Sequence, residues 1–145
     1  MKKKILFIPV MVLCLLFLAG CNKTEVGTKG KLEEGKDYTI DTSYNGQTID
    51  YAKRGYYIDS LDEPDAPYFY IICMGEKSTG GYGIKVKEIN KKDDLTEIIV
   101  EETSPDPGST VTQALTYPKV VVKFPKYQEK ITIKNTNGEE FQLLN

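Results

Sequence analysis

The stretch Tyr68-Phe69-Tyr70-Ile71-Ile72-Cys73-Met74 decides the fold of this chain. It is a continuous apolar run rich in aromatic and β-branched residues, which is typical of a strand that is buried on both faces. We therefore expect residues 68–74 to form a central strand of a sheet.

On the C-terminal side of this run, apolar and polar residues alternate with a period of two, which predicts half-buried β-strands. The alternating apolar residues are Tyr82, Ile84 and Val86, then Val120, Val122 and Phe124, then Ile131 and Ile133. Residues 95–100 form a further expected strand, in which Ile98 and Val100 face opposite to Ile99.

Clusters of Gly, Pro, Asn and Asp separate the expected strands and predict turns at residues 44–46, 63–67, 90–94 and 104–108. Asn137-Gly138, between the strand at 131–133 and residues 140–144, predicts a hairpin. Residues 110–115 are compatible with one helical turn. Short strands at this spacing, without a long amphipathic segment, predict an all-β fold over residues 37–145, either a small antiparallel β-sandwich or a barrel-like domain.

Residues 1–20 are typical of a signal peptide, because lysines 2–4 precede an apolar run over 5–18 and a small-residue cleavage site. Leu18-Ala19-Gly20-Cys21 resembles the lipobox of bacterial lipoproteins, in which the cysteine takes a diacylglyceryl group and cleavage occurs before it. The alternative, an uncleaved transmembrane anchor, is disfavoured because spanning a bilayer needs about 20 apolar residues. We expect Cys21 to carry the lipid, with acyl chains such as palmitate, on the extracytoplasmic face of a bacterial cell membrane.

Residues 21–36 follow the lipidated cysteine and contain Lys, Thr, Glu and Gly with scarcely an apolar side chain. Such a segment cannot bury enough apolar surface to offset its own ordering entropy. We expect a flexible tether that ends where the all-β domain begins, at residue 37.

The charge balance limits the classes of partner. The chain has 19 basic and 21 acidic residues, and residues 1–20 hold three of the basic ones, so the mature chain carries 16 basic groups and a net charge of −5. This balance argues against nucleic acid as a partner and against electrostatic attachment to anionic lipid heads. Attachment to the membrane therefore depends on the lipid, and two or more acyl chains make such an anchor stable.

The chain has no histidine, which excludes Ser–His–Asp triads and Cys–His dyads. A Ser–Lys dyad with Ser78 or Ser104 is formally possible, although loop serines are far more often turn formers. Cys73 is the only thiol left once Cys14 is removed and Cys21 is lipidated, and its apolar surroundings predict a buried core residue. We expect no catalytic residue, no intramolecular disulfide and no cofactor.

The densest group of carboxylates is Asp59, Asp62, Glu63 and Asp65. Paired carboxylates can hydrolyse glycosides, and carboxylate oxygens can hold Ca²⁺ weakly. Pro64 and Pro67 frame this group as a loop, and its spacing matches no calcium-binding pattern. The chain also lacks the His and Cys ligands that Zn²⁺ prefers. We expect a solvated acidic loop and no metal site.

Tyrosines crowd the segment between residues 38 and 57. They are Tyr38, Tyr44, Tyr51, Tyr56 and Tyr57. Tyrosine is enriched at protein interfaces and sugar-binding surfaces, but it is also a common strand residue. The sequence leaves both interpretations open, a binding surface or the filling of a sheet.

Residues 74–82 read Met74-Gly75-Glu76-Lys77-Ser78-Thr79-Gly80-Gly81-Tyr82. Adjacent glycines at the start of a strand indicate a positive φ or a close backbone approach. The segment is either a tight connection between two strands or an exposed loop presented to a partner.

Several segments resemble the PrcB C-terminal domain family, which is named after a protease complex subunit. The matching segments are residues 68–74, Gly75 to Ile84, Ser104-Pro105, Gly108, 111–114, 116–118 and 120–124, and they cover roughly residues 55–125. The resemblance implies a non-catalytic, lipoprotein-type subunit of a secreted subtilisin-like protease complex. Residues 78–82 are also similar to the Thr-Gly-Phe/Tyr loop of chagasin-like cysteine-protease inhibitors, which use an immunoglobulin-like sandwich.

Loops that flank neighbouring strands can lie at the same end of a sandwich, so we expect residues 75–82 and 104–113 to form one composite surface. The residues expected to contact a partner are Lys77, Ser78, Thr79, Gly80, Gly81, Tyr82, Ser104, Pro105, Gly108 and Gln113. The function we expect is a lipid-anchored accessory protein or modulator that binds a protease or another secreted protein. The alternatives are a protease inhibitor that inserts residues 79–81 into an active site, and a module that binds cell-wall glycan or a small ligand.

Overall fold

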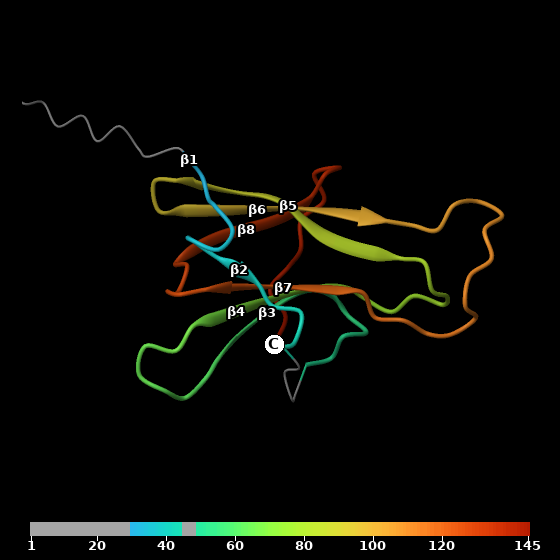
Figure 1. Ribbon diagram of the computed structural model, residues 1–145, viewed down its shortest axis with the longest axis horizontal. Helices are drawn as coiled ribbons and strands as arrows, with labels where there is room; N and C mark the ends of the chain where they lie inside the picture. Colours follow the sequence, from blue (N-terminus) through green and yellow to red (C-terminus); the bar gives the residue numbers. More distant parts are fainter. Residues whose placement is uncertain (1–29, 45–48) are drawn as a thin grey trace, which may run out of the picture.

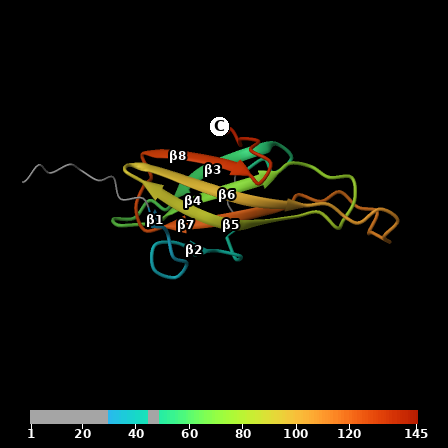
Figure 2. The same ribbon diagram turned by 90° about the horizontal axis from the view of Figure 1, so that it is seen from above.

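Two four-stranded sheets pack face to face in the computed structural model, which describes residues 30–44 and 49–145 (Figure 1). The first sheet has the order β1-β5-β6-β8, formed by Gly30–Lys31, Gly83–Lys92, Leu95–Thr103 and Lys130–Asn135. The second has the order β2-β7-β4-β3, formed by Thr39–Ile40, Lys119–Phe124, Tyr68–Met74 and Arg54–Ser60. The all-β sandwich predicted from the alternating pattern is confirmed. Figure 2 shows the connecting loops gathered at the two ends of the molecule.

Strand β4 is the central strand that its apolar run predicts. It lies between β7 and β3 and runs antiparallel to both, and its residues from Phe69 to Met74 are buried. Tyr70 and Ile72 face the core between the sheets, whereas Ile71 and Cys73 belong to a second apolar cluster on the other side of the sheet. An uninterrupted apolar sequence is needed because both faces of this strand are covered.

The core between the sheets follows the predicted alternation. In β6, Ile98 and Val100 are fully buried and Ile99 is half-buried on the opposite face. Strand β5 departs from strict alternation, because the register with β6 shifts between Val86 and Glu88. This β-bulge turns Ile89 into the core, where strict alternation from Val86 would place it outside.

A polar network joins the two sheets along the side formed by β3, β6 and β8. Arg54 of β3 pairs with Glu102 of β6, and Glu102 also accepts a hydrogen bond of 2.8 Å from the side chain of Asn135 in β8. Asn135 Nδ2 donates a second bond of 2.8 Å to Glu139, and the guanidinium carbon of Arg54 lies 4.1 Å from the ring centre of Phe141. These contacts hold the sheets together where β3 is an edge strand.

Strand β8 pairs in parallel with β6, which an all-antiparallel arrangement does not anticipate. The parallel pair arises because the chain crosses to the second sheet for β7 before it returns for β8. The alternation in residues 131–133 reports which face is buried, not which neighbour the strand has.

The hairpin predicted around Asn137-Gly138 is only half present. The turn forms, with Gly138 N donating to Asn135 O at 3.0 Å and Phe141 N to Ile133 O at 2.8 Å. The predicted second strand at 140–144 is wrong, because Glu140 makes one bridge to β8 and the chain then leaves for the edge of β3. There Tyr56 N donates to Gln142 O at 2.9 Å and Leu144 N to Tyr56 O at 2.8 Å. The chain diverges because Phe141 is buried between the sheets while Leu144 packs on the outer cluster.

The turns predicted at 63–67 and 90–94 are present, with positive φ at Asp65 (61°) and Asp93 (55°). The helical turn considered for residues 110–115 is wrong, because these residues form no helix and Thr112 O accepts a hydrogen bond from Gly80 N. The expected signal peptide, the expected lipidation site Cys21, most of the expected tether and part of the turn predicted at 44–46 lie outside the described residues. Within the described part of the chain, no helix is long and apolar enough to cross a membrane.

The boundary expected between tether and domain at residue 37 lies too far along the chain. Gly30 and Lys31 pair with Lys91 and Asn90, and Leu32 N donates to Ile89 O at 2.8 Å. Polar residues are tolerated here because an edge strand is held by backbone hydrogen bonds, which need no apolar side chains. Only Leu32 adds a packed side chain.

Candidate functional site

The two loops that the sequence singles out meet at one end of the sandwich. Residues 75–82 connect β4 to β5, residues 104–118 connect β6 to β7, and each therefore crosses from one sheet to the other. We call these two segments together the arm, and Figure 1 shows it projecting beyond the strands at the right of the molecule. The two loops expected to form a composite surface therefore lie at the same end of the sandwich.

Backbone hydrogen bonds fasten the two segments of the arm antiparallel to each other. Lys77 N donates to Thr116 O at 2.9 Å, Thr116 N donates back to Lys77 O at 2.9 Å, and Gly80 N donates to Thr112 O at 2.8 Å. Thr116 Oγ1 adds a bond of 2.8 Å to Thr79 O. The arm therefore behaves as a two-stranded unit, although its pairing amounts to a single bridge.

Gly81 marks the closest approach of the two segments. Its φ is +87°, and a Cβ placed there would lie 2.8 Å from Pro105 Cβ and 3.1 Å from Val111 Cγ1. The sequence predicted a positive φ or a close approach for the adjacent glycines, and Gly81 has both. Gly80 has neither constraint, since its nearest contact is an ordinary 3.5 Å to Thr112.

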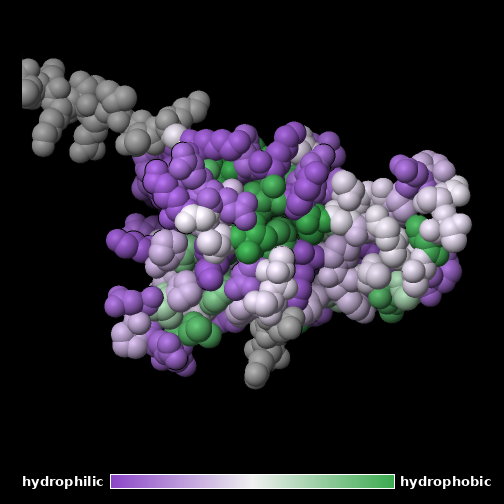
Figure 3. All heavy atoms as spheres, in the orientation of Figure 1, coloured by the Kyte–Doolittle hydropathy of each residue, from purple (hydrophilic) through white to green (hydrophobic). Residues whose placement is uncertain are grey.

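The arm is poor in charge. The whole chain is 28% charged, but residues 104–118 contain only Asp106, and residues 75–82 contain only Glu76 and Lys77. Tyr117 Oη donates to Glu76 at 3.1 Å, and this hydrogen bond raises the pKa of the phenol. Figure 3 shows the arm as a mostly pale surface between hydrophilic and hydrophobic.

Every residue expected to contact a partner lies on the arm, but these residues are not equally accessible. Those with exposed side chains or backbone are Ser78, Gly81, Ser104, Gly108 and Gln113, and those that are half-buried are Lys77, Thr79, Gly80, Tyr82 and Pro105. The half-buried group holds the arm together. Residues 79–81 in particular are no free loop, because residues 105, 111, 112 and 116 pack or hydrogen-bond against them.

Two exposed apolar residues of the arm were missed by the sequence analysis. Leu115 is 58% exposed and Tyr117 is 42% exposed. The signal that could have found them is an apolar pair in a segment that is otherwise rich in turn residues and precedes the expected strand at 120–124.

The tyrosines between residues 38 and 57 fill the sheet. Tyr56 and Tyr57 are each 8% exposed, and Tyr38 is equally buried. Tyr44 stacks on Phe69 with ring centres 4.3 Å apart, and burial, with its hydrogen bond to Asp59, raises the pKa of its phenol. The interpretation as an exposed sugar-binding surface is wrong for Tyr56 and Tyr57, because their rings are already packed in the two apolar clusters.

The side chains that the sequence suggested for catalysis or metal binding lie apart from one another. The Cys73 thiol is fully buried, and burial raises its pKa to about 11. Asp62, Glu63 and Asp65 are exposed, as a solvated loop predicts, while Asp59 accepts the hydrogen bond from Tyr44. Among residues 30–44 and 49–145, no three His, Cys, Asp or Glu side chains are placed to hold a metal ion.

Comparison with known proteins assigns a family to the segment that contains the arm. Residues 68–125 match a family model described as PrcB C-terminal. The matched segment runs from the start of β4 to just after β7, so it includes the whole arm and two adjacent strands of each sheet. No curated protein and no solved structure matches the chain. Residues 68–125 therefore belong to the PrcB C-terminal domain family.

Proposed function

We propose that this protein is a lipid-anchored, extracytoplasmic accessory protein that binds a protease or another secreted protein through the arm and catalyses no reaction itself. The observation that carries the proposal is the arm, a hydrogen-bonded, charge-poor projection that exposes Leu115 and Tyr117. Depletion of charge and enrichment of aromatic side chains distinguish the centre of protein interfaces from other surface. Function is also concentrated in loops held by a rigid scaffold.

Two further observations support a binding role over catalysis. The chain lacks histidine, and the Cys73 thiol is buried with a pKa of about 11, so neither usual route to an activated nucleophile is available. The family is named after a protease complex subunit, and this name suggests a protease as the partner. Insertion of residues 79–81 into an active site has less support, because Pro105, Val111 and Thr112 pack or hydrogen-bond against this segment.

The proposed contact can be tested by photo-cross-linking in intact cells. A benzophenone amino acid at Leu115 is expected to capture one discrete partner, whereas the same group at Leu143, which is 52% exposed and lies off the arm, is expected to capture none. Mass spectrometry of the product identifies the partner. Equal capture from both positions, or none from Leu115, would contradict the proposal.

The energetic role of the arm can be measured once the partner is purified. Leu115→Asp is expected to weaken binding more than about tenfold, because a charge in the centre of an interface loses its solvation. Leu143→Asp is the matched control and is expected to leave the affinity unchanged. Activity of a captured protease with and without this protein then separates an accessory subunit from an inhibitor.

The proposed anchor rests on the lipobox-like sequence at Cys21. In cells fed an alkyne analogue of palmitate, the native chain is expected to become labelled and to fractionate with membranes. Cys21→Ala is expected to abolish the label and to keep residues 1–20 attached, while Cys14→Ala is expected to change neither result. Labelling that persists in Cys21→Ala would rule out this anchor.

A further inference from the structure

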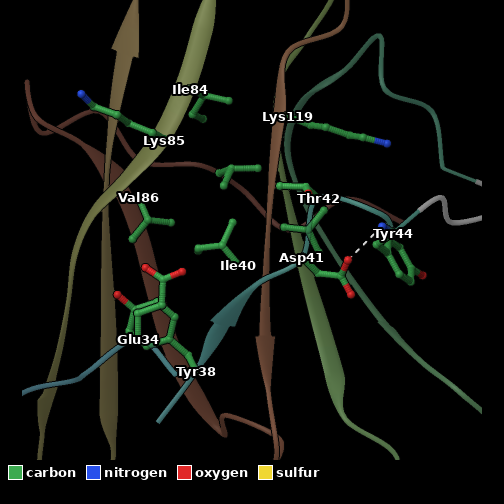
Figure 4. Close-up of a pocket in the computed structure, with 12 residues that line it drawn as sticks. Glu34, Tyr38, Ile40, Asp41, Thr42, Tyr44, Ile84, Lys85, Val86 and Lys119 are labelled. Atoms are coloured by element: carbon green, nitrogen blue, oxygen red, sulfur yellow. Dashed lines mark hydrogen bonds between the residues drawn. The ribbon is translucent and has the colours of Figure 1, made fainter. Parts of the chain in front are cut away.

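A groove of about 360 Å³ opens along the side of the sandwich between β5 and β7 (Figure 4). Its apolar lining includes Ile40, Ile84, Val86 and Val120. Figure 3 shows an apolar patch between the two sheets, beside the base of the arm. The groove is therefore an exposed apolar surface that the fold leaves uncovered within the described part of the chain.

The two short N-terminal strands close only part of this side. Strand β1 reaches β5 only near residues 89–91, and β2 with the residue after it reaches β7 only at residues 121–123. In the described residues, no strand pairs with the groove side of β5 from Gly83 to Glu88. This stretch is an open strand edge, whose unpaired backbone groups can accept another strand.

The charged side chains around the groove differ in whether they have interaction partners. Lys85 pairs with Glu101 at 2.9 Å, Lys119 lies 3.8 Å above the ring centre of Tyr51, and Asp41 accepts hydrogen bonds from the Ser43 and Tyr44 backbone. Among residues 30–44 and 49–145, no side-chain hydrogen bond or ion pair engages the carboxylate of Glu34. Figure 4 shows this carboxylate beside Tyr38, at the end of the groove near β2. The carboxylate of Glu34 is therefore available to a basic group of a ligand.

We propose that this groove binds an extended peptide segment of a partner protein, as an added strand along the open edge of β5. Alternate apolar side chains of the peptide fill the space over Ile84 and Val86, and a lysine or arginine lies at Glu34. This occupant fits the edge, the apolar lining and the charge together. A second copy of the chain fits less well, because antiparallel pairing of two such edges brings Lys85 and Lys87 of both copies together.

The groove is a second recognition site that does not depend on the arm. Its lining residues Ile40, Ile84, Val86 and Glu34 lie outside residues 75–82 and 104–118. Substitutions in the groove therefore leave Leu115 and Tyr117 in place, and the two sites can be tested separately.

The test begins with selection of short random peptides, displayed on phage, against the full chain purified in detergent. Selected peptides are expected to alternate apolar and polar residues and to carry a lysine or arginine near one end. Glu34→Lys is expected to weaken the selected peptide at least about fivefold, and to strengthen a version in which glutamate replaces its basic residue. Glu33→Lys, at the neighbouring exposed carboxylate, is the matched control and is expected to change neither affinity.

The apolar lining is tested by Val86→Asp, which is expected to weaken the selected peptide by more than tenfold. Ile99→Asp places the same charge at a half-buried position on the opposite face of the first sheet and is expected to keep the native affinity. Circular dichroism verifies that each variant is folded. If Val86→Asp does not fold, Ile40→Ser replaces it as the test of the apolar lining. Selection of no peptide, or of peptides that bind the groove variants as tightly as the native chain, overturns the proposal. Dimerisation through the groove in place of peptide binding also overturns it.

Discussion

The close packing of the two segments of the arm depends on a glycine at position 81. Gly81→Ala is expected to cost about 2–4 kcal/mol of local stability, because it adds the strain of a positive φ to a 2.8 Å clash with Pro105. Hydrogen exchange at the amides of Lys77, Gly80 and Thr116 measures the opening of the arm. Gly108→Ala is the control: Gly108 has a similar φ of +80° but open space around its Cβ position, so we expect only about 1 kcal/mol. Equal exchange in both variants would show that the close approach is unimportant.

Glu102 is expected to make the stability of the sandwich depend on pH. Burial raises the pKa of this carboxyl, but the hydrogen bonds from Arg54 and Asn135 and the nearby positive charges outweigh burial and hold the pKa below its usual value of 4.5. A carboxyl whose pKa is lower in the folded state stabilises that state at pH values above the unfolded-state pKa, and this contribution is lost as pH falls through the folded-state pKa. The free energy of unfolding in urea is measured from neutral pH to about pH 3. It is expected to fall less on acidification in Glu102→Gln than in the native chain.

Glu101→Gln is the matched control for this effect. Glu101 pairs with Lys85 on the solvated face of the first sheet, where water screens the pair. We expect its acid profile to follow that of the native chain closely. A profile in Glu102→Gln that is indistinguishable from native would contradict the assigned role of Glu102.

At the scale of elements, local pattern predicted burial well and pairing poorly. The apolar run of β4 and the alternation of β6 depend on which faces are covered, and sequence carries that information directly. The parallel pairing of β6 with β8 depends on the route of the chain through the other sheet, which no local pattern encodes. The bulge of β5 was visible only as a change of phase between Val86 and Ile89.

The candidate site, too, was predicted only in part from the sequence. Glycine and turn chemistry identified both segments of the arm, and the loops were expected at one end because their flanking strands are neighbours. Sequence could not show that Gly80 and Gly81 pack against Pro105, Val111 and Thr112, since these contacts join segments far apart in the chain. The groove was also beyond prediction, because it exists only where β1 and β2 are too short to cover β5 and β7.

The C-terminal segment is the element whose contribution to stability is easiest to isolate. Phe141 is 4% exposed and packs in the core beneath the guanidinium of Arg54, so Phe141→Ala is expected to lower the free energy of unfolding by about 3–5 kcal/mol. Leu143, two residues away, is 52% exposed, and Leu143→Ala is expected to cost less than about 0.5 kcal/mol. Urea titration compares the two variants. A small effect of Phe141→Ala would show that the segment contributes little to the stability of the sandwich.

On the scale of the whole molecule, one sheet is covered on both faces. The outer cluster, which includes Phe69, Ile71 and Cys73, is covered by Tyr44, Ile49, Tyr51 and Leu144. The Cys73 thiol, with a pKa of about 11, is therefore expected to resist iodoacetamide at neutral pH until the domain unfolds. Peptide mapping by mass spectrometry across a urea titration follows this residue alone, and its alkylation is expected to coincide with the loss of circular dichroism. Modification well before that transition would mean that the outer cover opens independently of the core.

The arm also determines how the molecule carries mechanical load. Its two segments continue into β4, β5, β6 and β7, so a pull from a protein attached there is shared among strands from the middle of both sheets. A tether ending in a lipid at Cys21 would pull instead on β1, an edge strand of two residues. Tension between membrane and partner would then peel β1 from β5 one backbone pair at a time, long before the sandwich ruptured. In a chain anchored and bound as proposed, the weak link under force would therefore lie at β1, and the arm would keep its shape.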